Sequence, residues 1–413
     1  MTQIQSFADV HKFLGKYIFD NGKKSGSYSL ERMRALMSEL GNPQDSYKVV
    51  HIAGTSGKTS TCYYTAALLV EEGQKVGMTV SPYVDEINER VQINLISMPE
   101  AEFCAELQEF VKVVEATTIK PTYFELLVAF AFWEFARQQV DYAVVEVGLG
   151  GLLDGTNVIN RPDKVCVITD IGMDHTDILG NTITKIAAQK AGIIQDHNSV
   201  FIYDQGLEVM EQVKSRCKQT HASLHLVEPS TDQTFKQRNF FLAHNVIDFI
   251  AQNETWPELS SNQLQKVESI TVPARMEELS YQGKKIIIDG SHNAQKMEAM
   301  VQDVSKLYPK KSVVVLVSLV DSEARRAPDT LNQLKNLTSK VIVTSFGGEQ
   351  DSPKRSLSSK QIANLAKQVG FGDIQVIDKP QQAFQVLLKQ PEDILVVTGS
   401  FYLLNHIRPL LKG

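Results

Sequence analysis

The segment that most constrains the fold is the hexapeptide GTSGKT at residues 54–59. It follows a short apolar run at residues 48–53 and precedes a helix-like stretch at residues 60–70. A strand, a glycine loop carrying Lys and Thr, and a helix form a phosphate-binding loop, because the loop amides and the helix N-terminus face an anion. Lys58 would add a positive charge, and the Thr59 hydroxyl could ligate Mg²⁺. The pattern predicts that the chain binds a nucleoside triphosphate.

The motif departs from the common pattern at one position. That pattern has a glycine five residues before Gly57, where this chain has Ile52. The alternative interpretation is an ordinary helix N-terminus with Thr59 near the cap. The strand and helix that flank the loop favour phosphate binding over this alternative.

Composition narrows the class of protein. The chain has 413 residues, enough for two or three domains, and its 43% hydrophobic and 22% charged residues are typical of globular proteins. A net charge of −6 argues against a general binder of nucleic acid or membrane surfaces. We see neither a membrane-spanning segment nor a signal peptide, and we expect a cytoplasmic protein. The scattered cysteines, at positions 62, 104, 166 and 217, predict buried free thiols.

Short β-branched runs alternate with helical segments in two series. The first series is residues 49–52, 76–80, 142–147 and 165–169, and the second is residues 285–289, 313–317, 341–344 and 394–398. Apolar strands separated by helices predict an α/β fold with parallel sheets covered on both faces. We expect a P-loop-type, mostly parallel sheet domain at residues 1–272 and a smaller Rossmann-like domain at residues 273–413. The linker is expected around Pro273.

Polar side chains stand at four strand ends of the first series. They belong to Thr59, Ser81, Glu146 and His175. Ligands of parallel sheets bind beyond the carboxyl ends of the strands, and these groups suit Mg²⁺ with phosphate and water completing its shell. Taken singly, Glu146 could instead form a structural salt bridge, and His175 could be a hydrogen-bonded loop residue. Their shared position beside the phosphate loop favours one site.

For two further groups the sequence allows both a structural and a functional interpretation. Lys190 lies in a mostly apolar helical stretch, and the residues alone favour a lysine whose ammonium group reaches solvent. In the second series, residues 289–293 (DGSHN) end an apolar strand. They could form an ordinary capped turn, or Asp289 and His292 could contact nucleotide or transfer protons.

Nine segments, in the same order along the chain, are similar to those of one family. They are YSLERM (28–33) with LGNPQ (40–44), HIAGTSGKT (51–59), SP (81–82) with NERV (88–91), EVGLGGLLDGTN (146–157), TDIGMDHTDILG (169–180), KAGI (190–193), VPARME (272–277), DGSHN (289–293) and GSFYL (399–403). The chain resembles the folylpolyglutamate synthase/dihydrofolate synthase family of the Mur ligase superfamily over nearly its whole length. Leu152, Gln189, Ser291 and the turn DSE at residues 321–323 depart from the family pattern, and none of these changes removes a phosphate or metal group.

The resemblance implies a role for each residue of the predicted site. The ATP phosphates would be held by Gly54, Thr55, Ser56, Gly57, Lys58 and Thr59. Two Mg²⁺ sites would be served by Thr59, Ser81, Glu146 and His175. Lys190 would be carbamylated, which reverses the interpretation from the residues alone. Arg275, Asp289 and His292 would reach the nucleotide from the C-terminal domain. Asn239 best matches the asparagine that contacts adenine in the family, and Asn245 is the alternative.

The activity implied by the resemblance is an ATP-dependent amide ligase. It would add L-glutamate to the carboxylate of a folate through an acyl phosphate, with Lys58, Lys190 and His292 as catalytic residues. The acceptor could instead be dihydropteroate, or both. A P-loop regulatory or transport NTPase is the alternative from another class, and glutamate-dependent release of ADP would distinguish the two. We expect small-molecule partners only, no nucleic acid or membrane, and a monomer.

Overall fold

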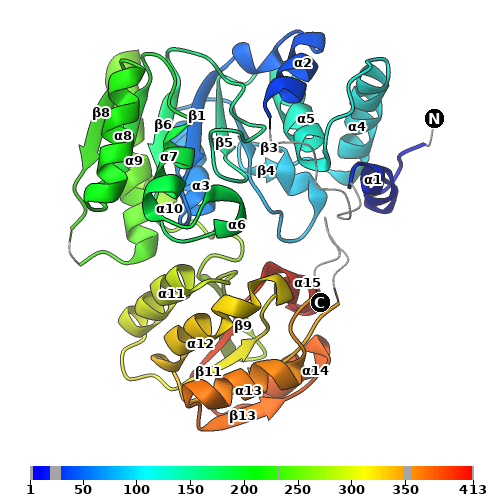
Figure 1. The fold of residues 1–413 in the computed structure, drawn as a ribbon, viewed down its shortest axis with the longest axis vertical. Coiled ribbons are helices and arrows are strands. Elements are labelled where there is room, and N and C mark those ends of the chain that lie inside the picture. The colour runs from blue at the N-terminus through cyan, green and yellow to red at the C-terminus, as the bar shows by residue number, and fades with distance from the viewer. Residues whose placement is uncertain (1–2, 19–28, 231, 348–354, 412–413) are drawn as a thin grey trace. The chain divides into compact units, whose positions relative to one another are not determined.

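The computed structural model describes residues 3–18, 29–230, 232–347 and 355–411. Tyr28, the first residue of the YSLERM segment, lies outside these ranges. The chain divides into two compact units, one formed by Met1–Gln233 with Gln237–Ile270 and the other by Thr234–Lys236 with Thr271–Gly413 (Figure 1). In the part of the chain described here, no helix is long and apolar enough to cross a membrane.

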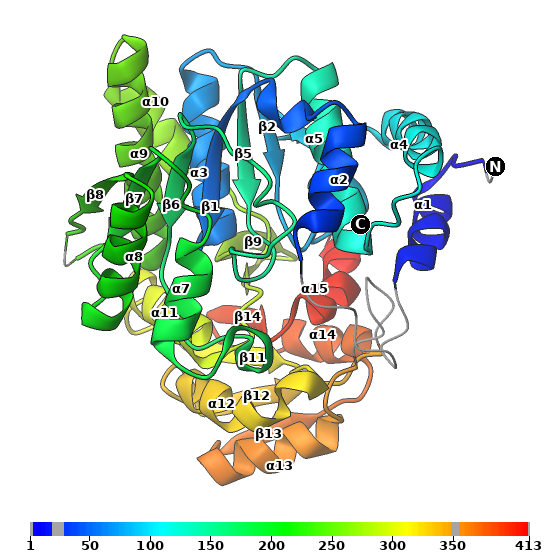
Figure 2. The ribbon, with the colours of Figure 1, turned by 45° about the horizontal axis from the view of Figure 1, so that its top comes forward.

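The first unit contains a sheet in the order β4-β3-β2-β5-β1-β6-β7-β8, which Figure 2 shows with β8 at its left edge. The strands are β1 (Lys48–Ala53), β2 (Val76–Thr79), β3 (Gln92–Ile93), β4 (Ile96–Ser97), β5 (Tyr142–Glu146), β6 (Val165–Ile168), β7 (Ser199–Tyr203) and β8 (Ser223–Val227). Neighbouring strands among β2, β5, β1, β6, β7 and β8 pair in parallel. Strand β3 pairs antiparallel with both β2 and β4. The predicted mostly parallel sheet is therefore confirmed.

Helices cover both faces of this sheet. They are α1 (Phe7–Leu14), α2 (Glu31–Glu39), α3 (Lys58–Glu71), α4 (Glu100–Glu115), α5 (Tyr123–Arg137), α6 (Thr176–Leu179), α7 (Ile183–Ala191), α8 (Leu207–Gln219), α9 (Phe235–Glu254) and α10 (Ser261–Glu268). On one face, Val49 and Val145 pack with α4 and α5, while Cys166 and Ile168 pack with α7 and α8. Successive strand residues point to opposite faces, and α3 and α9 cover the other face.

Strand β1 lies between β5 and β6, and this order positions the site. Ile52 pairs with Glu146 on one side and with Val167 on the other. Because all three strands are parallel, their carboxyl ends meet at one edge of the sheet. The loop after β1, Glu146 at the end of β5 and the turn after β6 are thereby brought together.

The second unit contains a sheet in the order β13-β12-β11-β14-β10-β9. Its strands are β9 (Glu277–Tyr281), β10 (Lys284–Ile288), β11 (Val313–Val317), β12 (Lys340–Val343), β13 (Asp373–Val376) and β14 (Ile394–Thr398). All pairs are parallel except β9 with β10, where a hairpin adds an antiparallel edge. This second α/β unit is also confirmed.

Five helices among the described residues pack on the second sheet. They are α11 (Ala294–Leu307), α12 (Ala327–Lys335), α13 (Ser359–Val369), α14 (Pro380–Leu388) and α15 (Phe401–Ile407). Helices α11, α12 and α13 share a core with Ile287, Val315 and Val343. Helices α14 and α15 contact β11, β12 and β14. Successive side chains of a strand point to opposite faces of the sheet. Helices α14 and α15 therefore cover the face opposite to the one that packs on α11, α12 and α13.

The four cysteines are free and buried, as the sequence predicts. Burial raises the pKa of each thiol above its ordinary value, to about 11 for Cys166 and for Cys217. At neutral pH these thiols are therefore protonated and act as small apolar side chains.

Candidate active site

The loop between β1 and α3 depends on two glycines. Gly54 (φ 155°) would place a Cβ atom 1.8 Å from Thr169 Oγ1, and Gly57 (φ 90°) would place one 2.4 Å from Asn239 Oδ1. Any larger residue would clash at both positions, and a positive φ further disfavours a side chain. Gly57 is the N-cap of α3, so the loop leads directly into the helix N-terminus where an anion is stabilised.

The turn after β6 holds this loop in place. The backbone N–H groups of Thr55 and Ser56 donate to the carbonyl of Asp170 at 2.8 and 3.1 Å. The Thr55 hydroxyl donates to the carbonyl of Gly172, and the Gly172 N–H donates back to the same hydroxyl, both at 3.1 Å. Two neighbouring strand ends therefore fix the loop that carries the glycines.

Two lysines converge on the same backbone oxygen. Lys58 Nζ donates to the carbonyl of Gly54 at 3.1 Å, and Lys190 Nζ donates to the same carbonyl at 2.7 Å. Lys190 is 4% exposed, so its ammonium group does not reach solvent as the residues alone suggested. Burial beside a second positive charge is unfavourable, because both charges lose hydration and repel each other.

Glu146 connects two of the other predicted residues, Thr59 and Ser81. Its side chain is buried, Oε1 accepts from the Thr59 hydroxyl at 3.0 Å, and Oε2 accepts from the Ser81 backbone N–H at 3.1 Å. The hydroxyl of Thr59 and the carboxylate of Glu146 are hard oxygen donors, which suit Mg²⁺. Within the described ranges, no cluster of three or more His, Cys, Asp or Glu side chains could hold a metal. A metal here would need nucleotide phosphates and water to complete its shell.

His175 lies in the turn after β6 and precedes α6. Its backbone is left-handed (φ 47°), its N–H donates to Asp174 Oδ1 at 3.0 Å, and Nε2 lies 3.9 Å from the same oxygen. The structure thus joins His175 to the buried Asp174, whereas it joins Thr59 and Ser81 to Glu146. Asp174 was not singled out from the sequence, although it directly precedes a predicted ligand.

Asn239, on α9, lies against the phosphate loop. It is 1% exposed, its Oδ1 packs beside Gly57, and its Nδ2 is buried without a hydrogen-bond partner among the described residues. By contrast, Asn245 Nδ2 donates to the carbonyl of Phe241 in its own helix at 2.8 Å. An orphaned buried donor is costly, and an adenine ring nitrogen could accept from it. The geometry favours Asn239 over Asn245 for contact with the base.

A buried hydrogen-bonded chain supports the loop after β5. His51 Nε2 lies 2.9 Å from Thr156 Oγ1, the Thr156 hydroxyl donates to Asp154 Oδ1, and Asp154 Oδ2 accepts from the Leu149 N–H at 2.7 Å. Because the Thr156 proton goes to the carboxylate, His51 Nε2 must be the donor in the first bond. Burial raises the pKa of Asp154 and, with Lys164, lowers that of His51 well below its usual value. His51 is therefore neutral.

In the second unit, Asp289 organises a turn at the end of β10. Its Oδ2 accepts from the Met276 N–H at 2.8 Å, and its Oδ1 accepts from the N–H and the hydroxyl of Ser291. Ser291, one of the departures from the family pattern, therefore donates a hydroxyl hydrogen bond to this carboxylate. These bonds fit the interpretation of a capped turn, and they also fix the residues around Arg275.

His292 is held between a carbonyl and a lysine. Its Nδ1 lies 2.9 Å from the carbonyl of Gly290, and its Nε2 lies 3.1 Å from Lys296 Nζ. A carbonyl can only accept, so Nδ1 carries the proton and Nε2 is the accepting nitrogen. Lys296 lies on the first turn of α11, four residues after His292, and was not singled out from the sequence.

Arg275 rests on an aromatic ring. Its guanidinium carbon lies 4.5 Å from the centroid of Phe401, whose ring also meets that of His292 edge-on at 6.1 Å. Cation–π contact of this kind favours a fixed guanidinium plane. Arg275 and His292 therefore both contact the ring of Phe401 in the second unit.

One further ion pair near the phosphate loop has no local signal in the sequence. Arg238 Nη2 lies 2.9 Å from Asp170 Oδ1, and the guanidinium lies over the ring of Tyr203. Burial raises the pKa of Asp170, while the charge of Arg238 opposes that shift. The pair connects the residue before Asn239 to the turn that holds the phosphate loop.

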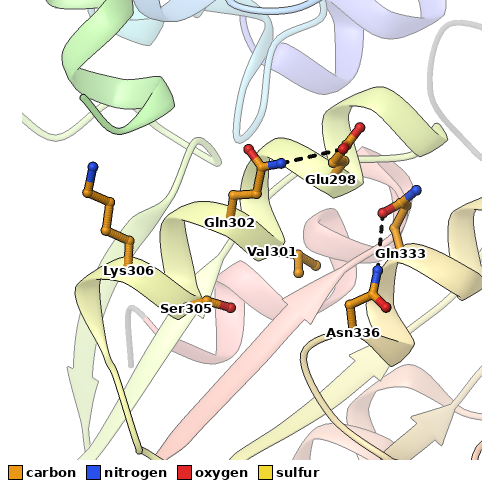
Figure 3. Close-up of a pocket in the computed structure, with 7 residues that line it drawn as sticks. All are labelled: Glu298, Val301, Gln302, Ser305, Lys306, Gln333 and Asn336. Carbon is orange, nitrogen blue, oxygen red and sulfur yellow. Dashed lines mark hydrogen bonds between the residues drawn. The ribbon is translucent and has the colours of Figure 1, made fainter. Parts of the chain in front are cut away.

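A cavity of about 480 Å³ lies elsewhere, between α11 and α12 of the second unit (Figure 3). It is lined by Glu298, Val301, Gln302, Ser305, Lys306, Gln333 and Asn336. Gln302 bonds to Glu298 and Asn336 to Gln333, so the amides are paired within their own helices or helix ends. None of the predicted site residues lines it, and we assign it no role.

Comparison with known proteins identifies the relatives of this chain. Models of the Mur ligase middle domain and of the Mur ligase glutamate ligase domain match residues 52–255 and 274–401. The chain is 28% identical to a dihydrofolate synthase/folylpolyglutamate synthase of Bacillus subtilis, over 93% of this chain and 95% of that protein.

Solved structures show the same fold. Mycobacterium tuberculosis folylpolyglutamate synthase complexed with ADP has a TM-score of 0.85 and 27% identity, covering 100% of this chain and 99% of that one. A bifunctional folylpolyglutamate synthase/dihydrofolate synthase of Yersinia pestis, complexed with AMPPNP and Mn, has a TM-score of 0.83 and 22% identity, covering 99% and 98%. With both domain models matched in order and relatives aligned over nearly their whole length, the chain belongs to the folylpolyglutamate synthase/dihydrofolate synthase family of the Mur ligases.

Proposed function

We propose that this chain is an ATP-dependent ligase that joins the amine of L-glutamate to the carboxylate of a folate. The observation that carries the proposal is the meeting of the phosphate loop with the Thr59–Glu146 pair at one edge of the first sheet. Family membership and the names of the relatives support the same reaction. The partners in this proposal are small molecules, and the chain acts as a monomer in the cytoplasm, where free buried thiols are stable.

ATP and a divalent metal fit the residues of the first unit. The N–H groups of Gly57, Lys58 and Thr59 at the N-terminus of α3, together with Lys58 Nζ, would hold the phosphates, while the N–H groups of Thr55 and Ser56 hold the loop to the Asp170 carbonyl. Thr59, Glu146 and Ser81 would serve one metal, and His175 a second one. When bound, Mg²⁺ would neutralise charge on the transferring phosphoryl group. The ADP and AMPPNP–Mn complexes of the relatives support nucleotide and metal binding.

Carbamylation of Lys190 is part of the proposal. Two ammonium groups directed at one carbonyl repel each other, and reaction of the Lys190 amine with CO₂ would replace one of them by an anion. The carbamate would then attract Lys58 and could help to hold a metal. Lys190→Ala is expected to lose activity, and short carboxylates are expected to restore part of it.

The reaction proceeds in two steps. An oxygen of the acceptor carboxylate attacks the γ-phosphorus of ATP, so that an acyl phosphate forms and ADP leaves. The neutral amine of L-glutamate then attacks the acyl carbon, and inorganic phosphate departs as the amide forms. Lys58 and the loop dipoles stabilise the charge that develops during transfer, mainly by position and electrostatics.

A base must take the proton of the attacking amine. His292 Nε2 is the accepting nitrogen of its ring, but Lys296 Nζ donates to it at 3.1 Å. The ring could accept the amine proton only after this ammonium group moves away, since a second positive charge beside it is unfavourable. Phosphate and water are the alternative bases.

The reaction is tested by measuring ADP release with Mg-ATP and L-glutamate, offering tetrahydrofolate and dihydropteroate in parallel reactions. Turnover with tetrahydrofolate identifies a folylpolyglutamate synthase, and turnover with dihydropteroate adds or substitutes dihydrofolate synthesis. ADP release that needs neither acceptor nor glutamate would instead identify a P-loop NTPase.

Lys58→Ala supplies the matched test of the phosphate loop. The variant is expected to lose turnover while keeping its fold, because the change removes one hydrogen bond of the lysine, to the loop carbonyl described above. The control is Lys112→Ala, which removes a lysine from an exposed pair with Glu109 on α4. Near-normal activity of Lys58→Ala would contradict the assignment of the loop.

A further inference from the structure

Arg275 stands between two residues with unusual backbone conformations. Ala274 has φ 54° and Met276 has φ 45°, so both adopt the left-handed region without being glycine. Side chains with a Cβ atom disfavour this region, and such residues persist only where surrounding contacts hold them. The loop that presents Arg275 therefore depends on its supports.

Two buried carboxylates supply the first support. Glu277 Oε2 accepts from the Ala274 N–H at 2.8 Å, and Asp289 Oδ2 accepts from the Met276 N–H at 2.8 Å. Each of the two left-handed residues is thus anchored through its own amide. Charged acceptors make stronger hydrogen bonds than neutral ones, which suits strained positions.

The C-terminal segment supplies the second support. Arg408, which directly follows α15, forms an ion pair with Glu277 Oε2, and the two side chains are 9% and 7% exposed. Phe401, the first residue of α15, places its ring against the guanidinium of Arg275 at 4.5 Å. The C-terminal segment from Phe401 to Arg408 therefore carries both the partner of the anchoring carboxylate and the ring in contact with Arg275.

We propose that Glu277, Arg408 and Phe401 are positioning residues for Arg275, through which the C-terminal helix sets the place of its guanidinium at the nucleotide. This inference rests on the proposed function and on the expectation, implied by the family resemblance, that Arg275 reaches the nucleotide. Because Glu277 balances the charge of Arg408, Arg408 influences Arg275 by holding the loop at residues 274–276 in place and not through its own charge. Arg275 donates to the Ala274 carbonyl and lies over the Phe401 ring.

The test compares Arg408→Met and Arg408→Lys with Arg275→Ala. AMPPNP affinity is measured by calorimetry, and kcat and KM for ATP are measured separately. Arg408→Met is expected to weaken AMPPNP binding at least about tenfold, the loss of one hydrogen bond to a charged group, and Arg408→Lys to restore part of it. In the Arg275→Ala background, Arg408→Met should add no further loss. The proposal would be overturned if Arg408→Met weakened AMPPNP binding equally in the Arg275→Ala background, or if it did not weaken binding in the wild-type background.

Controls separate positioning from folding. Lys311→Met removes an exposed ion pair with Asp393 in the same unit and should leave AMPPNP binding unchanged. If Arg408→Met does not fold, Phe401→Leu is tested in its place, because this change removes the ring next to Arg275 and leaves the Arg408–Glu277 ion pair intact. A wild-type protein that binds AMPPNP but shows no glutamate-dependent turnover would overturn the proposed function alone. A wild-type protein that does not bind AMPPNP would overturn both proposals.

Discussion

At the residue scale, the site is distinguished by buried polar groups whose arrangement suits a ligand. Glu146 is a buried carboxylate at the end of an otherwise apolar strand, and Asn239 keeps a buried donor without a partner among the described residues. A buried charge and a buried donor without a partner both lower the stability of a fold, although the hydrogen bonds from Thr59 and Ser81 offset part of this cost at Glu146. Their cost is therefore evidence for binding, and it can be measured.

Replacing Asn239 tests whether its amide, unpartnered among the described residues, contributes to ATP binding while adding nothing to the stability of the fold. Asn239→Leu has a similar volume and removes the orphaned amide, so the free energy of unfolding without nucleotide should not decrease by more than about 0.5 kcal/mol. The Kd for ATP should rise about tenfold, corresponding to the loss of one hydrogen bond of about 1.4 kcal/mol. Urea unfolding and calorimetric titration would measure the two effects.

The control for this variant is Asn245→Leu, which removes an amide bonded within its own helix. It should leave ATP affinity unchanged. If instead Asn245→Leu weakens binding and Asn239→Leu does not, the assignment of the adenine contact is reversed.

At the element scale, the site depends on how β1, α3 and the neighbouring strand ends join. The turn from β1 into α3 uses left-handed glycine backbone, and the turn after β6 holds it by two backbone hydrogen bonds. The loop after β5 is tied to β1 by the chain from His51 through Thr156 to Asp154. Each connection can be altered separately.

Gly57→Ala and Gly73→Ala make a matched pair. Both glycines have positive φ, 90° and 81°, so either alanine should cost about 1–2 kcal/mol of stability. Only at Gly57 would the Cβ meet another group, Asn239 Oδ1 at 2.4 Å, whereas nothing lies within 4 Å at Gly73. Gly57→Ala should therefore also lose nucleotide binding. Equal ATP affinity in the two variants, measured by titration, would contradict the geometry of the loop.

His51 should make the stability of the first unit depend on pH. Its pKa in the folded protein lies well below the ordinary value because the ring is buried. The unfolded ring takes up a proton below about pH 6.5 and the folded ring does not, so stability is lost as pH falls below that value. The slope attributable to His51 should approach about 1.4 kcal/mol per pH unit.

Urea unfolding of the wild type and of His51→Gln between pH 5 and pH 7.5 would measure this slope. The glutamine can still donate to Thr156 but does not titrate, so the variant should show a shallower loss of stability on acidification. Parallel curves for the two proteins would mean that the ring is protonated in the folded state.

At the scale of the whole molecule, the chain has two sheets with separate cores, and the phosphate loop, Glu146 and Asn239 all belong to the first unit. A ligand that binds only the folded state stabilises it by mass action. Mg-ADP at one hundred times its Kd should therefore raise the free energy of unfolding by about 2.7 kcal/mol.

Scanning calorimetry would detect this as a higher melting temperature, and the increase should disappear in Lys58→Ala but remain in Lys112→Ala. A melting temperature that does not respond to Mg-ADP in the wild type would contradict nucleotide binding by the first unit.

The sequence predicted both parallel sheets, because apolar β-branched runs and glycine loops are local signals. It also grouped Thr59, Ser81 and Glu146, since parallel strand ends meet at one edge. It did not identify the pairing of Glu277 with Arg408, which are 131 positions apart, or that of Asp170 with Arg238. Such contacts depend on tertiary packing, which has no periodicity in the sequence. Lys296 was missed although its spacing of four from His292 at a helix start could have indicated it.

The burial of all four thiols has a practical consequence for labelling. Alkylating reagents react with the thiolate, and raised pKa values keep its fraction small at neutral pH. A cysteine introduced at an exposed position, such as Leu207→Cys at the start of α8 where the natural side chain is 81% exposed, would react far faster. The chain can therefore carry a single fluorophore or spin label while its natural cysteines stay in place.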